Sequence, residues 1–245
     1  AELPVRFKSR EDVLAFLDKC QQAEFKADAV SKKPLKRSPA PPFTTSTLQQ
    51  EAARKLGFTV SQTMTIAQHL YENGKITYMR TDSVNLSALC INGSKEEICQ
   101  LWGDKYSKPR QFHTQSKGAQ EAHEAIRPTD MTASTIEGRA QEKRLYELIW
   151  KRTIASQMAD AEIEKTTVNV SGTGLDEQFV ANGEVVKFDG FIKVYRESTD
   201  DDEQIDAEGS RMLPPIYEGQ PLQRREVSAL QRYTQSPMRY TEASL

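Results

Sequence analysis

The period of the hydrophobic pattern changes twice along this chain, and that change limits the folds available to it. Apolar and polar side chains alternate at residues 25–29, apolar residues recur at helical spacing between residues 46 and 158, and alternation returns from Ala161. A helix repeats its faces about every 3.6 residues and a strand about every two, so one element cannot serve both patterns. We therefore expect a multidomain α+β chain, in which a helical domain is inserted into a discontinuous β-rich domain.

Proline marks the first boundary of this arrangement. Residues 31–42 lack apolar periodicity and contain Pro34, Pro39, Pro41 and Pro42, which is typical of a connector between domains. The predicted division comprises a first β-rich part (1–39), a helical domain (40–160), a second β-rich part (161–235) and the start of a following helical domain (236–245).

Cap residues predict where several helices begin. Ser9 with Asp12 resembles a capping box, and Ser46 with Gln49 resembles a second one. Gly57 stands where a left-handed residue would end that second helix.

A third helix is expected from Ser61 to Gly74, so residues 46–74 are a helix-turn-helix candidate. Longer helical patterns cover residues 87–102 and 141–158.

Apolar side chains in short or alternating runs predict further strands. These runs lie at residues 5–7, 75–79, 186–194 and 222–231. The acidic segment 198–209 is predicted to be a loop, because it combines high charge with few apolar residues.

Composition excludes several classes of protein. The 245 residues are 37% hydrophobic and 28% charged, as in a globular protein, and no apolar run approaches the roughly 18 residues of a membrane span. Cys20, Cys90 and Cys99 form no C-x-x-C pair, so neither a disulfide framework nor a thiolate zinc site is indicated. The N-terminus lacks signal-peptide features, and we expect a cytoplasmic protein without a membrane partner.

Tyr78 lies at the edge of a short β-like run and precedes a polar loop. Arg80 would point to the same side as Tyr78 if the strand continued, and hydroxyl and carboxyl groups surround the pair. A tyrosine with an ordinary pKa near 10 needs about 4 kcal/mol to ionise at pH 7. A fixed guanidinium could recover about 1–3 kcal/mol of this cost and could pair with phosphate oxygens. The alternative is a tyrosine that only packs on one face of a strand.

His123, Glu124 and Arg127 form a near miss to the zinc motif H-E-x-x-H, because Arg127 replaces the second histidine. This replacement argues against a metalloprotease. If the segment before Pro128 were helical or turn-like, His123 and Arg127 would share a face and offer two donors to a phosphodiester. The alternative is a histidine that only caps or packs. Gly74 and Lys75 lack the remainder of a P-loop, so no nucleotide site is predicted.

Three motifs occur in a fixed order: P-F-T-T-S-T-L-Q-Q-E-A at 42–52, I-T-Y-M-R-T-D-S at 76–83 and A-H-E-A-I-R-P-T-D at 122–130. Together they resemble the bacterial DNA topoisomerase I branch of the type IA DNA topoisomerase family. The run V-K-F-D-G-F-I-K-V at 186–194 extends this resemblance into the second half of the chain. The resemblance implies that the β-rich domain is an arch that moves the helical domain to open a gate for DNA.

The resemblance also implies roles for individual residues. Tyr78 would be the nucleophile and become linked to a 5′ phosphate, Arg80 would stabilise the scissile phosphate, and His123 would donate a hydrogen bond to it. The implied DNA-binding residues are Gln68, Glu72, Thr77, Thr81, Asp82 and Arg127. Transesterification conserves the bond energy, so no ATP would be needed.

The resemblance implies partners and a cofactor beyond these residues. The intact enzyme would relax negatively supercoiled DNA near the nucleoid, acting on a single-stranded segment with the remaining domains of its polypeptide. It would use Mg²⁺ held by a separate acidic domain, and no metal ligand is assigned within this chain. The acidic run Asp200–Asp202 lacks the flanking strand of such a site. Residues 1–245 alone are therefore expected to be inactive.

Two alternatives remain open on sequence grounds. The helix pair could belong to a non-catalytic DNA-binding module with Tyr78 packed, since a net charge of −2 does not favour phosphate binding by itself. The β-rich part could instead be a scaffold that binds a protein partner. A positive surface around Tyr78 distinguishes the DNA-related functions from the scaffold.

Overall fold

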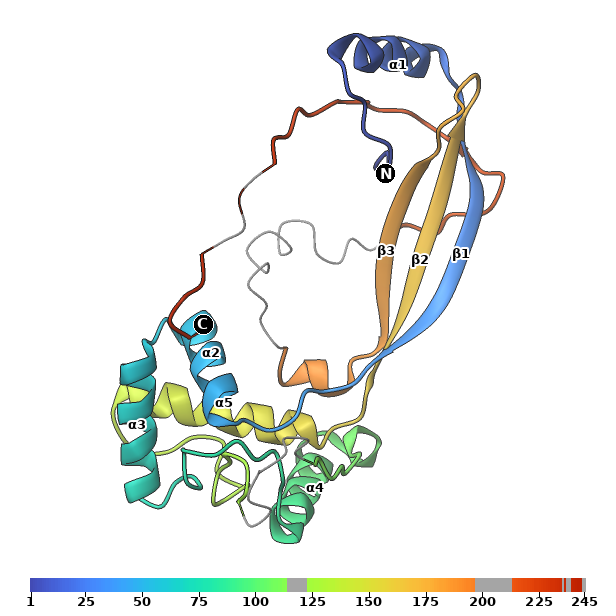
Figure 1. Ribbon diagram of the computed structural model, residues 1–245. Helices are drawn as coiled ribbons and strands as arrows, with labels where there is room; N and C mark the ends of the chain where they lie inside the picture. The colour runs from blue at the N-terminus through green and yellow to red at the C-terminus, as the bar shows by residue number, and fades with distance from the viewer. Residues whose placement is uncertain (114–122, 197–212, 235, 237–238, 244–245) are drawn as a thin grey trace. The chain divides into compact units, whose positions relative to one another are not determined.

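The computed structural model describes residues 1–113, 123–196, 213–234, 236 and 239–243 (Figure 1). The chain folds into two compact units. The sheet unit contains Ala1–Leu35, Glu162–Lys187 and Ala207–Pro237, and the helical unit contains Lys36–Ala161, Phe188–Asp206 and Met238–Leu245. Helices and a multi-stranded sheet confirm the predicted α+β class.

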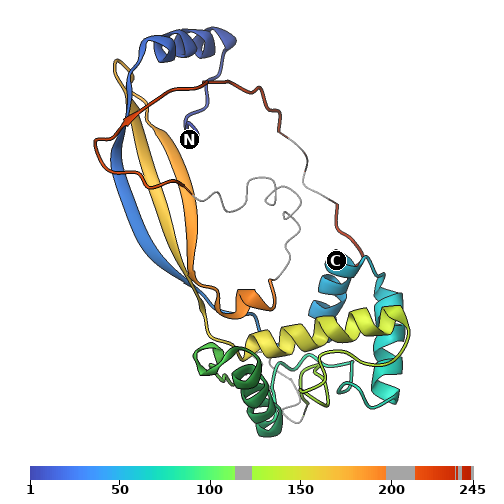
Figure 2. The same cartoon turned by 180° about the vertical axis from the view of Figure 1, so that it is seen from behind.

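A four-stranded sheet of order β3-β2-β1-β4 organises the sheet unit. Its elements are α1 (Arg10–Gln22), β1 (Phe25–Arg37), β2 (Ala161–Gly172), β3 (Phe179–Phe188) and β4 (Pro221–Leu222). β4 pairs antiparallel with the start of β1, where Phe25 faces Leu222. Figure 2 shows α1 at one end of the three long, curved strands. Burial alternates along β2, as the two-residue period predicts.

Aromatic packing fixes α1 to this unit. Phe16 lies 5.0 Å from the Phe7 ring and 6.0 Å from the Phe179 ring, measured between centroids. The predicted cap is confirmed, since the Ser9 hydroxyl accepts from the Asp12 N–H at 3.1 Å.

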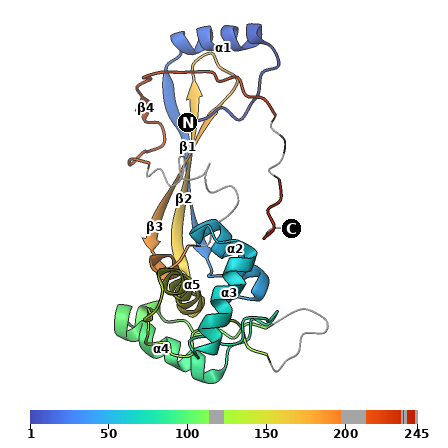
Figure 3. The same cartoon turned by 90° about the vertical axis from the view of Figure 1, so that its left-hand side faces the viewer.

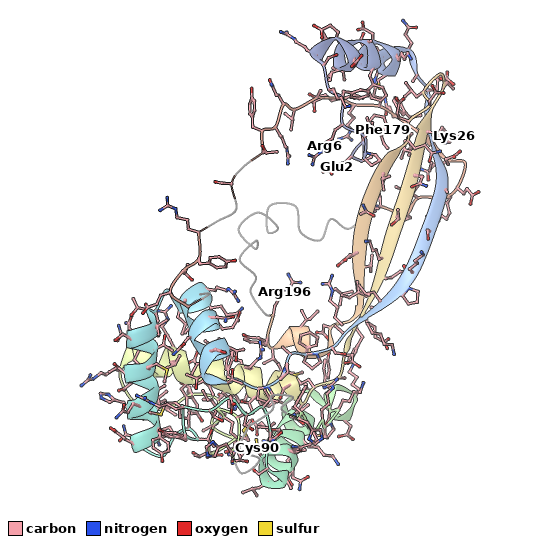
Figure 4. All side chains as sticks on the ribbon, viewed as in Figure 1. Glu2, Arg6, Lys26, Cys90, Phe179 and Arg196 are labelled. Atoms are coloured by element: carbon pink, nitrogen blue, oxygen red, sulfur yellow. The ribbon has the colours of Figure 1, made fainter. Side chains whose placement is uncertain are left out.

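The strand predicted at residues 5–7 is wrong. Instead, Glu2 forms an isolated bridge with Val180, beside the labelled Phe179 (Figure 4).

The helical unit packs around its longest helix. It contains α2 (Thr45–Leu56), α3 (Val60–Glu72), α4 (Ala88–Trp102), the 3₁₀ turn η1 (Asp104–Tyr106), α5 (Ala140–Ser156) and the 3₁₀ turn η2 (Gly190–Lys193). α5 contacts α2, α3, α4 and η2, and Figure 3 shows α2 and α3 beside it. The largest fully buried apolar side chains are Tyr146, Phe43, Leu48, Ile76, Ile98, Ile126, Leu145, Ile149, Ile154 and Met158. Most helical apolar positions predicted from the sequence therefore lie in one core.

The observed caps of α2 and α3 lie two residues before the predicted ones. Thr44 caps α2 in a reciprocal box with Thr47, and Thr59 caps α3. Ser46 and Ser61 are therefore not the N-caps, because a preceding threonine already satisfies the first free N–H groups. Gly57 ends α2 in the left-handed conformation, at φ 69°, as predicted.

Three further expectations about secondary structure are wrong. Residues 31–37 belong to β1 and are not a connector, and Pro34 is tolerated there because β4 pairs only with the start of β1. The strand expected at 186–194 ends at Phe188, and η2 follows it. Beyond Leu222 the described residues form no strand, and residues 239–243 contain a turn and no helix. The acidic loop at 198–209 lies outside the described residues.

The segment after β3 returns to the helical core. Phe191 and Tyr195 are 9% and 6% exposed, and the Tyr195 hydroxyl donates to Glu51, which is 2% exposed. Burial, followed by this bond to Glu51, raises the pKa of Tyr195 far above its usual value. Arg152 stacks on the Tyr195 ring at 5.3 Å from the centroid. Residues 188–196 accordingly belong to the helical unit, whereas the sequence pattern placed them in the second β-rich part.

We predict that Gly190→Ala lowers the free energy of unfolding by about 2–5 kcal/mol. Gly190 has φ 50°, and an added Cβ would lie 2.5 Å from the carbonyl oxygens of both Ala159 and Asp160. Gly57→Ala is the matched control, because φ is also positive there but nothing lies within 4 Å; it should cost only about 1–2 kcal/mol. Urea unfolding of the variants measures both effects, and equal losses would contradict the close contact.

Candidate active site at the start of α2

The segment that carries Tyr78 is irregular. The strand expected at residues 75–79 is wrong, because its one bridge joins Ile76 to Pro128. Ile76 and Met79 are nevertheless 1% and 4% exposed, whereas Tyr78 is 47% exposed. The buried neighbours hold the backbone to the core and leave the Tyr78 ring at the surface.

Tyr78 packs against an aromatic side chain of α3. The rings of Tyr71 and Tyr78 meet edge to face, with centroids 5.2 Å apart and an interplanar angle of 66°. The sequence motifs did not single out Tyr71, which is 42% exposed. On the same helix, the Gln68 amide donates to the Glu72 carboxylate at 2.9 Å. These two predicted DNA-binding residues are exposed and pair with each other.

An open cleft of about 640 Å³ brings four of the predicted residues together. Its lining consists of Thr44, Thr45, Ser46, Arg80, Thr81, Asp82 and His123. Tyr78 does not line this cleft, although it lies two residues from Arg80 in the chain. Arg80 carries a positive charge, and the N-terminal end of α2 contributes a positive potential from the helix dipole. The His123 ring can donate a hydrogen bond. This combination suits an anion such as a phosphodiester.

The start of α2 is the part of the cleft that sequence reasoning missed. Residues 44–46 were considered only as a helix cap within a family motif, and their place beside Arg80 follows from tertiary structure alone. The available signal was the motif itself, P-F-T-T-S-T, which is richer in hydroxyl groups than one cap requires.

Thr45 binds the backbone around Arg80 directly. Its N–H donates to the Thr81 carbonyl at 2.9 Å, and its hydroxyl donates to the Met79 carbonyl at 2.8 Å. The same hydroxyl accepts from the Thr81 N–H at 2.9 Å. Thr81 is 7% exposed, and its own hydroxyl accepts from the Ser83 N–H. Thr81 therefore serves the backbone of this segment rather than presenting a free hydroxyl.

Thr77 joins the Tyr78 segment to the His123 segment. Its hydroxyl donates to the Ala125 carbonyl at 2.6 Å and accepts from the Arg127 N–H at 3.0 Å. Its N–H donates to the Arg127 carbonyl at 2.9 Å. Thr77 does not line the cleft, and its polar groups hold two motifs of the chain together.

Arg127 is held by an ion pair with Glu124. Residues 123–130 are not helical, and His123 lines the cleft whereas Arg127 does not, so the predicted shared face of His123 and Arg127 is wrong. The Arg127 guanidinium is 12% exposed and donates to Glu124 at 2.6 Å. Glu124 also accepts from the Ser87 N–H at the start of α4, at 2.7 Å. Burial raises the pKa of Glu124, but the bonds from Ser87 and Arg127 outweigh it and leave the pKa below its ordinary value.

Within the described residues, no group of three or more His, Cys, Asp or Glu side chains is arranged to hold a metal ion. Asp82 is the one carboxylate lining the cleft, and a Mg²⁺ site usually needs further oxygen ligands. The described helices include none with the length and apolar character required to cross a membrane.

Comparison with known proteins identifies the family of this chain. The family model for DNA topoisomerase matches residues 2–245. The chain belongs to the DNA topoisomerase family, in its bacterial topoisomerase I branch.

Individual relatives extend this result. DNA topoisomerase 1 of Zymomonas mobilis is 50% identical over 230 residues, which are 92% of this chain and 19% of that protein. DNA topoisomerase 1 of Rickettsia felis is 44% identical over 97% of this chain and 32% of its own length. Full-length topoisomerase I from Thermotoga maritima superposes with a TM-score of 0.71 at 34% identity, over 89% of this chain and 35% of that one. The chain thus spans about a third or less of these relatives.

We predict that Glu124→Gln destabilises the helical unit at neutral pH and that this loss shrinks on acidification. The folded pKa of Glu124 lies below its ordinary value of 4.5, so its stabilisation is complete above that value and disappears as the pH falls through the folded pKa. Urea unfolding from pH 7 to pH 3 measures the difference between variant and parent. Glu96→Gln, at an exposed position of α4, is the control. A difference that does not vary with pH would contradict the role of the charge.

Proposed function

We propose that this chain is the tyrosine-bearing part of a type IA DNA topoisomerase, which cleaves and reseals one DNA strand without ATP. The supporting observation is an exposed Tyr78 two residues from Arg80, which lines an open cleft together with His123. In the reaction, the Tyr78 hydroxyl loses its proton and its oxygen bonds to a backbone phosphorus, while the bond from that phosphorus to the 3′ oxygen breaks and the 3′ oxygen takes up a proton. Attack by that 3′ oxygen on the 5′-phosphotyrosine reverses the step and restores the phosphodiester.

Arg80 and His123 are proposed to act on the phosphate rather than on the tyrosine alone. Both side chains are exposed in the cleft and can donate to non-bridging oxygens as charge accumulates there. Asp82 faces the same cleft, and its negative charge would disfavour a second phosphate close to it. Gln68 and Glu72 lie on α3 with Tyr71 and are proposed to contact DNA near Tyr78. For Thr77, Thr81 and Arg127, the bonds described above support a structural role instead of direct DNA binding.

The proposed activity needs parts of a longer polypeptide. Mg²⁺ would be held by carboxylates outside these residues, and the DNA substrate would be a single-stranded segment of an underwound duplex. The remaining domains of the same polypeptide would close over Tyr78 and complete the charge neutralisation. A cytoplasmic location beside the nucleoid follows from a DNA substrate in a bacterium.

We expect Tyr78→Phe to abolish covalent strand cleavage in a full-length topoisomerase that contains this sequence. Only the phenolic oxygen is removed, so single-strand binding should stay within a few fold and the ring contact with Tyr71 should persist. Denaturing gels detect the covalent adduct, and fluorescence anisotropy measures binding. Tyr217→Phe, at a 73% exposed tyrosine of the sheet unit, is the control. Normal relaxation by Tyr78→Phe would refute the assignment.

Arg80→Ala and His123→Ala should each slow cleavage by about 10²–10³-fold, the effect of losing one donor from a preorganised site. Neither should lower the melting temperature by more than a few degrees, because both side chains are exposed. Single-turnover cleavage and calorimetry provide the two measurements. Arg6→Ala, at an exposed arginine of the sheet unit, controls for loss of charge. Unchanged kinetics with a large fall in melting temperature would show that the residues are structural.

A further inference from the structure

Arg80 is positioned by its backbone. Its side chain is exposed, and among the residues that the structure describes it makes no hydrogen bond or ion pair. No neighbouring side chain therefore fixes the guanidinium in the cleft. Its location depends on the path of the chain from Met79 to Thr81, which is an irregular segment without strand partners.

Thr45 fixes that path on both sides of Arg80. The carbonyl before Arg80, from Met79, accepts from the Thr45 hydroxyl at 2.8 Å. The residue after it, Thr81, is bound twice, since its N–H donates to the same hydroxyl and its carbonyl accepts from the Thr45 N–H, both at 2.9 Å. One residue thus spans the backbone immediately before and after Arg80.

Thr45 is itself held rigidly. It is the first residue of α2, directly after the Thr44 cap, which bonds reciprocally with Thr47. About one and two turns further, Leu48 and Ala52 are fully buried in the core of the helical unit. The first turn of α2 therefore connects the buried core to the backbone on both sides of Arg80.

We infer that Thr45 is a positioning residue for Arg80 in strand cleavage, an inference that rests on the proposed function. Its hydroxyl is committed to backbone groups, so it acts through Arg80 and not as a ligand of the phosphate. Displacement of a catalytic group by about 1 Å can cost 10²-fold in rate. Removing the hydroxyl leaves the Met79 carbonyl and the Thr81 N–H without this partner and releases the segment.

The test uses Thr45→Val and Thr45→Ser in a full-length topoisomerase that contains this sequence. Valine keeps the shape and the N–H but removes the hydroxyl, whereas serine keeps the hydroxyl. We expect Thr45→Val to reduce the single-turnover cleavage rate by about 10–100-fold, with the Kd for single-stranded DNA within about threefold. Thr45→Ser, which keeps the hydroxyl, should cleave at a rate within about threefold of that of the parent. Thr45→Cys, with a weak donor of similar size, should fall between them.

A double-mutant cycle separates positioning from general stability. In an Arg80→Ala background, Thr45→Val should lower the remaining rate less than about twofold, because the group that it positions is absent. The control is Thr65→Val, which removes a comparable hydroxyl bond to the Ser61 carbonyl on α3 and should leave the rate unchanged. An unchanged rate in Thr45→Val, or equal losses with and without Arg80, would overturn the inference. Failure of the proposed function is recognised separately, by a parent enzyme that forms no adduct at Tyr78.

Discussion

The candidate site depends on one constraint: the chain between α3 and α4 has no helix or strand to satisfy its backbone polar groups. Buried N–H and C=O groups without partners cost about 1–3 kcal/mol each, so such a segment is stable only where other parts of the chain supply bonds. Thr45 supplies them from one side, and the Arg127 carbonyl supplies one to the Thr77 N–H from the other. These contacts let Tyr78 and Arg80 remain exposed on a backbone that is nevertheless fixed.

This arrangement explains why the motifs of the sequence are longer than their reactive residues. The reactive side chains need an irregular segment, and the hydroxyl groups of Thr45 and Thr77 replace the partners that a sheet would provide. The pair Arg127–Glu124 has a similar function, since it connects the His123 segment to the N-terminus of α4. Much of each motif therefore consists of residues whose hydrogen bonds fix the backbone of the other motifs.

Sequence reasoning predicted the elements whose signals are local. Helices were located because burial follows a 3.6-residue period, and α4 and α5 agree with their predicted ranges within about two residues. The caps of α2 and α3 were misplaced because several hydroxyl residues adjoin and only one can occupy the non-helical position. The run at 75–79 has the composition of a strand, but a strand also needs a pairing partner, which composition does not reveal. For the site, the motifs identified Arg80, Asp82 and His123 as neighbours, whereas the contribution of residues 44–46 depended on tertiary packing.

The return of the chain from β3 to the helical core sets an order of events during synthesis. Helices α2 to α5 are complete at Ser156, but Tyr195, the partner of Glu51, is made only after β2 and β3. At roughly 5–20 residues per second, the intervening stretch of about 40 residues takes about 2–8 s to emerge. During that interval Glu51 lacks its phenol partner, and the Tyr195 ring that later stacks on Arg152 is missing. A nascent helical unit therefore cannot reach its final packing before the two long strands that follow it have been translated.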